Sequence, residues 1–290
     1  MVERVSIVYF SGTGSTAKAA ECFKTAFGRR RINVSCHEIF RSALRPDGKT
    51  GADMLVALFP VHALNAPLPV YEWLDGAAHV DNIPAAVISV SGGGEMTPNR
   101  ACRLATIKCL QKKGYNVIHD SMLVMPSNIL IRTADSLSAR LLEALPLRVE
   151  RLVDELLAGE KRRGRPDFSN TLLSRFGELE QVGAPWVGAA IKANAGCTGC
   201  GWCETNCPCG NIAMKAGRPE FRKSCVLCMR CMYGCPRKAL RPGIFKSFFL
   251  KDGFDLKVME SVTAASENEV KRLAPGVLWK GLREYLQGKR

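Results

Sequence analysis

The chain has 290 residues, of which 47% are hydrophobic and 23% are charged, so it is long enough for two folded domains and shows no sign of long disordered stretches. Its formal net charge of +14 permits contact with nucleic acid, an anionic membrane or an acidic protein. Because the sequence contains no helix-turn-helix, RNP motif or interleaved aromatic stripe, we expect no nucleic-acid partner.

Residues 2–125 alternate between strand-like and helix-like segments. Short apolar runs predict five strands, at 5–10, 32–39, 54–59, 85–90 and 116–124. Helical spacing predicts helices between them, at 15–28, 67–78 and 99–113. Continuous apolar runs are typical of parallel strands that are covered on both faces. We therefore expect an α/β fold built on a five-stranded parallel sheet.

One apolar stretch is nearly long enough to span a bilayer. Residues 54–71 carry no Lys, Arg, Asp or Glu. They include Pro60, Pro67 and Pro69, which break helices, so the stretch is predicted to be a buried strand followed by a loop. No transmembrane segment is expected.

Composition divides the chain into four parts, which are residues 1–160, a connector at 161–195, a cysteine module at 196–243 and a tail at 244–290. The polar run EKRRGRPD marks the first boundary.

Two helical regions lie outside the sheet. Residues 136–158 are predicted to form a long helix that Pro146 interrupts. The tail contains two faintly amphipathic pieces, and its basic end, which includes Trp279, is expected to be a solvated helix face.

The loop SGTGST at residues 11–16 follows the first strand. Gly12, Gly14 and Ala17 fit a dinucleotide fingerprint, and Glu38 lies where a ribose-binding acid is expected. However, four of the six loop residues carry hydroxyl groups, which suit a terminal phosphate at a helix N-terminus. A simple glycine-rich turn is a third interpretation. The ATP P-loop is excluded because Lys18 has the wrong spacing from Gly12.

The N-terminal part resembles flavodoxins, whose (Ser/Thr)-x-Thr-Gly-x-Thr loop is matched by Ser11, Thr13, Gly14 and Thr16. This resemblance implies a flavodoxin-like doubly wound sheet and the cofactor FMN, with the flavin ring between the loops that follow strands three and four. The residues implied for FMN are Ser11, Gly12, Thr13, Gly14, Ser15, Thr16, Pro60, Val61, His62, Asn65, Ser91, Gly92, Gly93 and Gly94.

The chain departs from flavodoxins at the flavin ring. Flavodoxins usually stack aromatic side chains there, whereas the third-strand loop offers only His62 and the fourth-strand loop offers none. We therefore expect an open ring site. His62, Asn65 and Glu95 are the polar residues expected near the ring, and no catalytic residue is assigned. Residues 125–128 are expected to be an ordinary loop.

Thirteen cysteines are present, and eight of them form two sets with the spacing C-x2-C-x2-C-x3-C. The sets are Cys197, Cys200, Cys203 and Cys207, and Cys225, Cys228, Cys231 and Cys235. The second set repeats the first at an offset of 28 residues, and each set is followed by proline. Cys209 has no counterpart in the repeat and is expected to be an unliganded thiol, with an alternative ligand or a redox-reactive cysteine as the other interpretations. The other four, Cys22, Cys36, Cys102 and Cys109, are expected to be small buried hydrophobic residues.

The spacing indicates two [4Fe–4S] clusters. Three closely spaced thiolates surround one cluster, and the fourth cysteine turns away to the other cluster. Cluster one takes Cys197, Cys200, Cys203 and Cys235, and cluster two takes Cys225, Cys228, Cys231 and Cys207. Zinc sites pair two closely spaced cysteines with a distant second pair, and they do not use a third cysteine six residues after the first. Here the chain resembles bacterial-type ferredoxins, which implies a small α+β domain.

The cysteine usage also predicts the compartment. An odd number of cysteines argues against a disulfide framework, and the start MVERVSIVYF lacks a secretory pattern. A reducing cytoplasm is therefore expected.

Taken together, the order of parts resembles the flavodoxin–ferredoxin fusion proteins of anaerobic bacteria, and the segment FKSFFLKDGFDLKVM resembles the region after their clusters. The resemblance implies low-potential electron transfer between the clusters and FMN. The alternative is a flavin-dependent reductase of a quinone or nitro compound. Eight Lys or Arg and two Glu lie within 196–243, so redox partners with acidic docking surfaces are expected.

Overall fold

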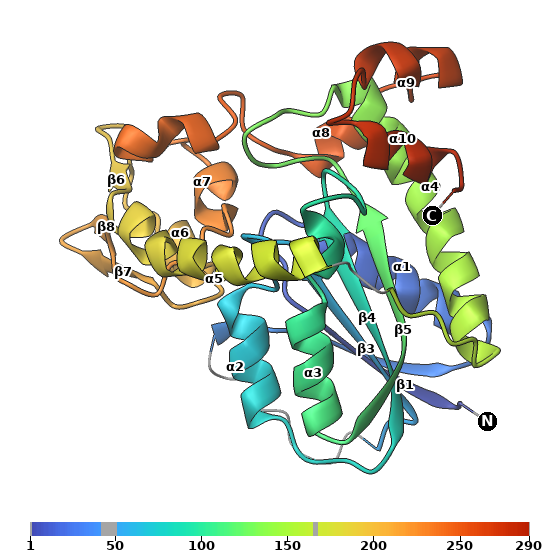
Figure 1. The fold of residues 1–290 in the computed structure, drawn as a ribbon. Helices are drawn as coiled ribbons and strands as arrows, with labels where there is room; N and C mark the ends of the chain where they lie inside the picture. The colour runs from blue at the N-terminus through green and yellow to red at the C-terminus, as the bar shows by residue number, and fades with distance from the viewer. Residues whose placement is uncertain (1, 42–50, 165–167, 290) are drawn as a thin grey trace.

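The predicted parallel sheet is present in the computed structural model, which describes residues 2–41, 51–164 and 168–289 (Figure 1). Its strands are β1 (Arg4–Tyr9), β2 (Asn33–Glu38), β3 (Met54–Pro60), β4 (Ile83–Ser91) and β5 (Tyr115–Val124). Neighbouring strands pair in parallel, in the order β2-β1-β3-β4-β5. This is the order of the flavodoxin-like doubly wound fold, so the predicted fold class is confirmed. The sheet and its helices are called the flavodoxin-like domain below.

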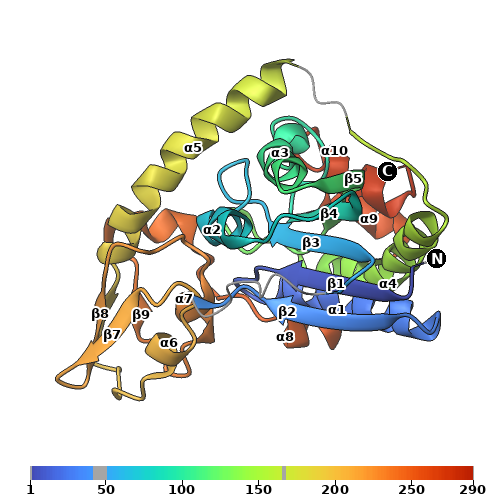
Figure 2. The ribbon, with the colours of Figure 1, turned by 90° about the horizontal axis from the view of Figure 1, so that it is seen from below.

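Helices cover both faces of the sheet (Figure 2). One face carries α1 (Ser15–Arg29) and α4 (Asp135–Leu157), and the other carries α2 (Leu68–Gly76) and α3 (Leu104–Lys112). Along β3, Val56 enters the core beneath α1 and α4, and Ala57 enters the core beneath α2 and α3. Successive side chains of a strand point to opposite faces, and both faces are buried here. The apolar run therefore contains no polar position.

The predicted interruption at Pro146 is wrong, because α4 continues through it from Asp135 to Leu157. Pro146 is exposed, whereas Leu145 and Val149 are fully buried in the core. A proline inside a helix costs about 3 kcal/mol. Packing of the apolar face of this 23-residue helix offsets that cost.

The connector contains one long helix, α5 (Phe168–Ala189), which leads from the side of α3 to the cysteine module (Figure 2). A short 3-10 helix of the flavodoxin-like domain, η2 (Asn99–Ala101), contacts it. The boundary predicted in the polar run at 160–167 lies partly outside the described residues, which omit 165–167.

The cysteine module is a small α+β unit. Its elements are β6 (Lys192–Ala193), α6 (Trp202–Thr205), β7 (Ile212–Lys215), β8 (Arg218–Phe221), α7 (Arg230–Gly234) and β9 (Leu240–Arg241). β7 pairs with β8 and β6 pairs with β9, both antiparallel. β6 precedes residue 196 and pairs with β9 inside the module.

The repeat seen in the cysteine spacing is also present in the backbone. α6 and α7 begin at Trp202 and Arg230, which have the same offset as the two cysteine sets. Each helix follows a residue with positive φ, which is 72° at Gly201 and 64° at Met229. The two halves of the module therefore share a local fold.

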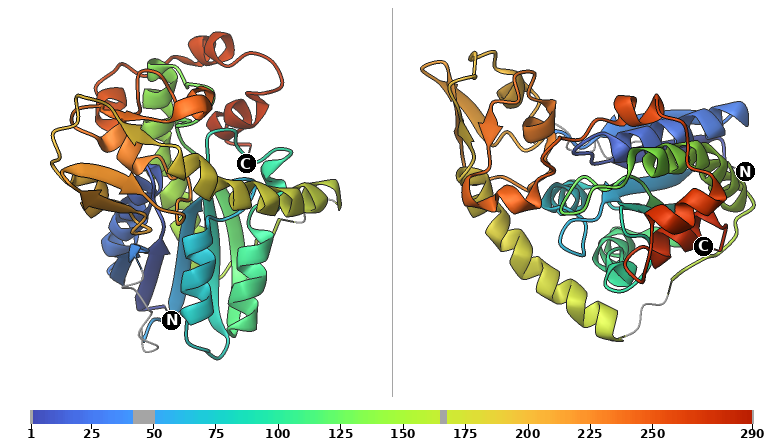
Figure 3. Two further views of the ribbon diagram at one scale, coloured as in Figure 1. Left: turned by 90° about the vertical axis from the view of Figure 1, so that its left-hand side faces the viewer. Right: turned by 90° about the horizontal axis from the view of Figure 1, so that it is seen from above.

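The tail folds back beside α4 (Figure 3). It consists of η3 (Gly243–Phe248), α8 (Leu256–Glu260), α9 (Glu267–Leu273) and α10 (Lys280–Leu286). Val270 and Leu282 are buried in the same core as α1 and α4, so the tail completes the flavodoxin-like domain. Among the helices of the described residues, none is both long and apolar enough to cross a membrane.

A buried arginine links two strands to the loop at 91–96. Arg103 is only 2% exposed. Its guanidinium donates to Asp120 Oδ2 at 2.7 Å on β5 and to Ser89 Oγ at 2.9 Å on β4, and it pairs with Glu95 in the loop. Glu95, predicted near the flavin ring, is therefore held by Arg103.

Replacing Arg103 should destabilise the flavodoxin-like domain. Arg103→Leu removes the closer of the two cations that pair with the buried Asp120 carboxylate, leaving Arg163 at 3.5 Å, and it also removes the cation that pairs with Glu95. It is expected to lower the free energy of unfolding by about 3 kcal/mol. Urea unfolding followed by far-UV circular dichroism measures this. Arg100→Leu, an exposed change of the same type, is the control and should shift the midpoint little. Equal shifts in the two variants would contradict the structural role given to Arg103.

Candidate functional site

A cavity of about 460 Å³ lies at the carboxyl ends of the strands, where doubly wound sheets bind ligands. Its wall includes eleven of the fourteen residues predicted for FMN, which are Ser11, Gly12, Thr13, Ser15, Thr16, Pro60, Val61, His62, Ser91, Gly92 and Gly93. The loops after β1, β3 and β4 therefore meet around one space, which is called the main cavity below.

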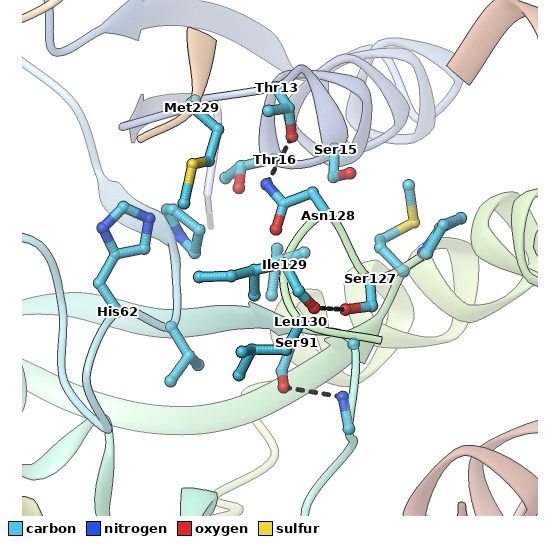
Figure 4. Close-up of a pocket in the computed structure, with 18 of the residues that line it drawn as sticks. Thr13, Ser15, Thr16, His62, Ser91, Ser127, Asn128, Ile129, Leu130 and Met229 are labelled. Carbon is cyan, nitrogen blue, oxygen red and sulfur yellow. Dashed lines mark hydrogen bonds between the residues drawn. The ribbon is translucent and has the colours of Figure 1, made fainter. Parts of the chain in front are cut away.

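The loop after β1 presents hydroxyl groups and the start of a helix to the main cavity. Gly14 precedes α1 with φ 100°, a conformation that favours glycine. Ser11 Oγ accepts a hydrogen bond from the Ala17 N–H at 3.2 Å and so anchors the first turn. Thr13 Oγ1 accepts from Asn128 Nδ2 at 2.8 Å (Figure 4). The N-terminus of α1 adds positive partial charge at this end of the cavity.

Gly14, Asn65 and Gly94 do not line the main cavity. The Asn65 side chain is buried and contacts the connector, where Nδ2 donates to the Ser174 carbonyl at 2.6 Å and Oδ1 accepts from the Ser174 hydroxyl at 2.7 Å. Asn65 therefore lies outside the main cavity and contacts α5. Gly94 allows the tail to approach, because a Cβ there would lie 2.7 Å from the carbonyl carbon of Gly281.

His62 links the main cavity to the cysteine module. Its Nδ1 is 3.1 Å from the Val226 carbonyl, so Nδ1 carries the proton and donates. Burial lowers the pKa of His62 to about 4. The imidazole is therefore neutral at pH 7 and acts here as a hydrogen-bond donor.

Further segments, which were not among the residues predicted for FMN, contribute to the wall. The loop after β5, expected to be ordinary, contributes Ser127, Asn128 and Ile129 (Figure 4). The tail contributes Trp279, which was expected to lie on a solvated helix face. The cysteine module contributes Met229 and its neighbours. The Trp279 ring adds an aromatic group that the loops after β3 and β4 lack.

The cysteines line two smaller cavities in the crossed arrangement that their spacing predicts. The first is lined by Cys197, Cys200, Cys203 and Cys235. The second is lined by Cys207, Cys225, Cys228 and Cys231, and also by Cys209. Among the described residues, no three His, Cys, Asp or Glu side chains form a group that could hold a single metal ion.

Backbone N–H groups approach the last cysteine of each set in the same way. Asn211 N–H donates to Cys207 Sγ at 3.2 Å, and Ala239 N–H donates to Cys235 Sγ at 3.4 Å. The donor lies four residues after the cysteine in both cases, so the two halves of the module share this contact. Cys209 has no such equivalent and packs against the core beneath α2 and α3.

The main cavity and the second cysteine cavity share a wall. Val226, Leu227 and Met229 line both. All residues that line the first cysteine cavity lie between Cys197 and Leu240, so it is enclosed by the cysteine module alone. The cavities therefore form a series in which the second cysteine cavity lies next to the main cavity.

The cysteine module also forms hydrogen bonds with the loop after β1. Arg230 donates to the Ser11 carbonyl at 2.8 Å and to the Gly12 carbonyl at 3.0 Å, and it pairs with Glu38. Glu38 was the acid that the dinucleotide interpretation assigned to a ribose, and here it is engaged by Arg230. A Cβ on Gly12 would lie 2.1 Å from the Cys228 carbonyl oxygen, so the two backbones touch.

No protein-family model and no curated protein sequence matches the chain. Similar solved structures include a flavodoxin from the domain Archaea, with 11% identity and a TM-score of 0.37, covering 53% of this chain and 99% of its own. Flavodoxin 1 of Bacillus cereus has 14% identity, a TM-score of 0.38 and coverage of 52% and 97%. General stress protein 14 of Treponema denticola, in complex with FMN, has 15% identity, a TM-score of 0.35 and coverage of 53% and 96%. At these identities and TM-scores the similarity does not identify a function.

A methyl group on Gly12 should separate the two domains. In Gly12→Ala the new Cβ collides with the Cys228 backbone, which no side-chain movement can relieve. We expect faster proteolysis of the connector and a lower thermal midpoint. Gly28→Ala, where a Cβ meets nothing within 4 Å, is the control and should be neutral or stabilising. A Gly12→Ala protein as resistant as the parent would refute the close contact.

Proposed function

We propose that the chain is an electron-transfer protein that carries FMN in the main cavity and a [4Fe–4S] cluster in each cysteine cavity. The observation that supports this most strongly is the wall of Val226, Leu227 and Met229, which the main cavity and the second cysteine cavity share. A cofactor on each side of so thin a wall would be close enough for direct electron exchange. When bound, FMN supplies a step between one-electron and two-electron carriers, and the chain holds the cofactors in order.

For FMN, the residues present fit a phosphate and a flat ring. Ser11, Thr13, Ser15 and Thr16 offer hydroxyl groups beside the N-terminus of α1 and would hold the phosphate. The segments 60–62 and 91–93 would enclose the ring, with Trp279 in the same wall. Arg230 supports this site indirectly by fixing the Ser11 and Gly12 carbonyls.

For the clusters, the first cysteine cavity offers four thiols, and the second offers four besides Cys209. Each thiolate of a [4Fe–4S] cluster binds a different iron, so the sulfurs need not converge on one point as they do around a single ion. Cys197, Cys200, Cys203 and Cys235 would hold cluster one, and Cys207, Cys225, Cys228 and Cys231 would hold cluster two. Cys209 is proposed to remain an unliganded thiol that packs between the domains.

With these cofactors, the chain fits the flavodoxin–ferredoxin fusion family that its sequence resembles, and we propose membership of that family. We also propose a reducing cytoplasm as its compartment. All thirteen cysteines are free in the structure, and eight of them are required as thiolates by the proposed clusters.

A reductase of a small apolar acceptor is the second candidate, and one observation favours it. Leu130, Ile131 and Leu278 line the main cavity while they are 61%, 45% and 60% exposed. An apolar rim of this kind suits a flat molecule such as a quinone or nitro compound. In this case the same flavin would pass electrons to the bound acceptor.

Iron content tests the cluster assignment. Anaerobically purified protein is expected to contain about eight irons per chain, as two [4Fe–4S] clusters require. Cys207→Ala should lose about half of that iron, because it removes a ligand of cluster two. Cys209→Ala is the matched control two residues away, and it should keep the full iron content and absorption spectrum. Parent protein that lacks iron would refute the proposed function, and iron loss in Cys209→Ala would refute the assignment of that thiol.

Flavin affinity tests the main cavity. Thr13→Val removes a hydroxyl group next to the proposed phosphate and is expected to weaken FMN binding by about 10- to 100-fold, as for loss of one hydrogen bond to a charged group. Quenching of flavin fluorescence measures the affinity. Thr198→Val, an exposed change in the cysteine module, is the control. Unchanged affinity in Thr13→Val would place the phosphate elsewhere. Acceptor turnover that disappears in Thr13→Val and returns with excess FMN would favour the reductase.

A further inference from the structure

The cysteine module presents a basic face beside the first cysteine cavity. Five exposed cations form it: Lys192, Arg218, Arg237, Lys238 and Arg241. Arg237 lines the first cysteine cavity directly. Cys200, in the same cavity, is itself exposed, whereas Cys207 in the second cavity is buried. The first cysteine cavity is therefore the more accessible of the two, and it is bordered by positive charge.

Contacts show that these cations form one continuous group. Lys192 and Arg241 are partners in the pairing of β6 with β9. Arg241 donates to the Lys238 carbonyl at 2.7 Å, and Lys238 follows Arg237 in the chain. Arg218 donates to the carbonyls of Ala193 and Asn194 at 3.0 and 3.1 Å, beside β6. This group of five residues is called the basic face below.

The charge on the basic face is not neutralised within the described residues. None of its five members is within salt-bridge distance of a carboxylate there. Segment 196–243 contains two acidic residues. Of these, Glu220 pairs with Lys215, and Glu204 accepts a hydrogen bond from the Met214 N–H. Uncompensated charge around an accessible site attracts partners of the opposite sign and speeds their encounter.

The chemistry of the basic face favours a protein over a membrane or a nucleic acid. Among the described side chains from 190 to 243, no large hydrophobic residue is exposed. The exposed Trp186 of α5 lies under Lys223, which is not a member of the basic face. A surface that inserts into a lipid interface needs such residues, and a surface that binds single-stranded nucleic acid needs exposed aromatic rings. Carboxylates on a folded partner require only the cations, and the position of Arg237 in the wall of the first cysteine cavity favours a partner that exchanges electrons.

We propose that the basic face is the docking surface for an acidic redox protein, and that electrons enter or leave the chain through the first cysteine cavity. This inference rests on the proposed function. One electron passes between the two proteins, the protein that gives it up is oxidised and the other is reduced, and no bond forms and no proton moves. Within the chain, electrons then pass from the cluster proposed for the first cysteine cavity to the cluster proposed for the second, and from there to the FMN proposed for the main cavity.

Two inorganic complexes of opposite charge test the basic face. Dithionite-reduced, desalted full-length protein is mixed in a stopped-flow instrument with ferricyanide, which is an anion, or with hexaammineruthenium(III), a cation. At low ionic strength, the ratio of the ferricyanide rate to the ruthenium rate is expected to exceed its high-salt value by about tenfold or more.

Charge reversal on the basic face tests whether its cations cause the difference between the two rates. Arg237→Glu/Lys238→Glu is expected to lower the rate ratio at low salt by at least about fivefold, and the milder Arg237→Gln/Lys238→Gln should lower it less. The control, Lys271→Glu/Arg272→Glu, makes the same change in net charge at exposed positions of α9. Its rate ratio should stay within about twofold of the parent's ratio. An equal fall in the control, or a ratio that does not depend on salt, would overturn the inference.

The same variants separate this inference from the proposed function. Iron and flavin contents are measured in each variant. If the parent protein lacks clusters, the proposed function is wrong. If clusters are present but the charge reversal leaves the ferricyanide-to-ruthenium rate ratio unchanged, only the proposed docking surface is wrong. Poly-L-glutamate, used as a probe for an acidic polypeptide, should slow ferricyanide oxidation of the parent and not of Arg237→Glu/Lys238→Glu. Tighter binding of phosphatidylglycerol vesicles or duplex DNA than of poly-L-glutamate at the basic face would overturn the choice of a protein partner.

Discussion

The close approach of Gly12 to Cys228 is the contact on which the arrangement of the cavities depends. No side chain separates the loop after β1 from the backbone of the second cysteine set. Arg230 reinforces this contact by donating to the Ser11 and Gly12 carbonyls. Because closely packed backbone leaves no room for sliding, the main cavity and the second cysteine cavity are held at one separation. A fixed separation matters for electron exchange, whose rate falls steeply with distance.

Features with a local signal could be predicted from the sequence. Short apolar runs identified the strands, because the central strands of a parallel sheet are covered by helices on both faces and are rich in apolar residues. The cysteine repeat predicted that Cys207 would lie with the second set and Cys235 with the first, and the two cysteine cavities have this composition. The loop at 11–16 was placed correctly at the carboxyl end of β1, since its glycine and hydroxyl residues act within one turn of chain.

Features that depend on distant contacts could not be predicted. Asn65 follows β3 and resembles a cavity residue, but Ser174 on α5 binds its side chain. Pro146 was expected to break a helix because the local rule ignores the packing of α4 on the core. Trp279 reaches the main cavity only because the tail folds back beside α4, and no periodicity in the tail signals this. In each case the deciding partner lies far away in sequence.

The main cavity is assembled from segments that leave the ribosome at different times. Three parts of its wall come from distant parts of the chain, and in order of synthesis they are the loop at 11–16, the segment 226–229, and Leu278 with Trp279. They are called the first, second and third walls here. At a synthesis rate of roughly 5–20 residues per second, the second wall emerges roughly 10–40 seconds after the first. A nascent chain that has folded its parallel sheet therefore still lacks the part of the apolar wall that the cysteine module and the tail supply. A ligand that contacts all three walls is retained only late, after the cysteine module and the tail have both docked.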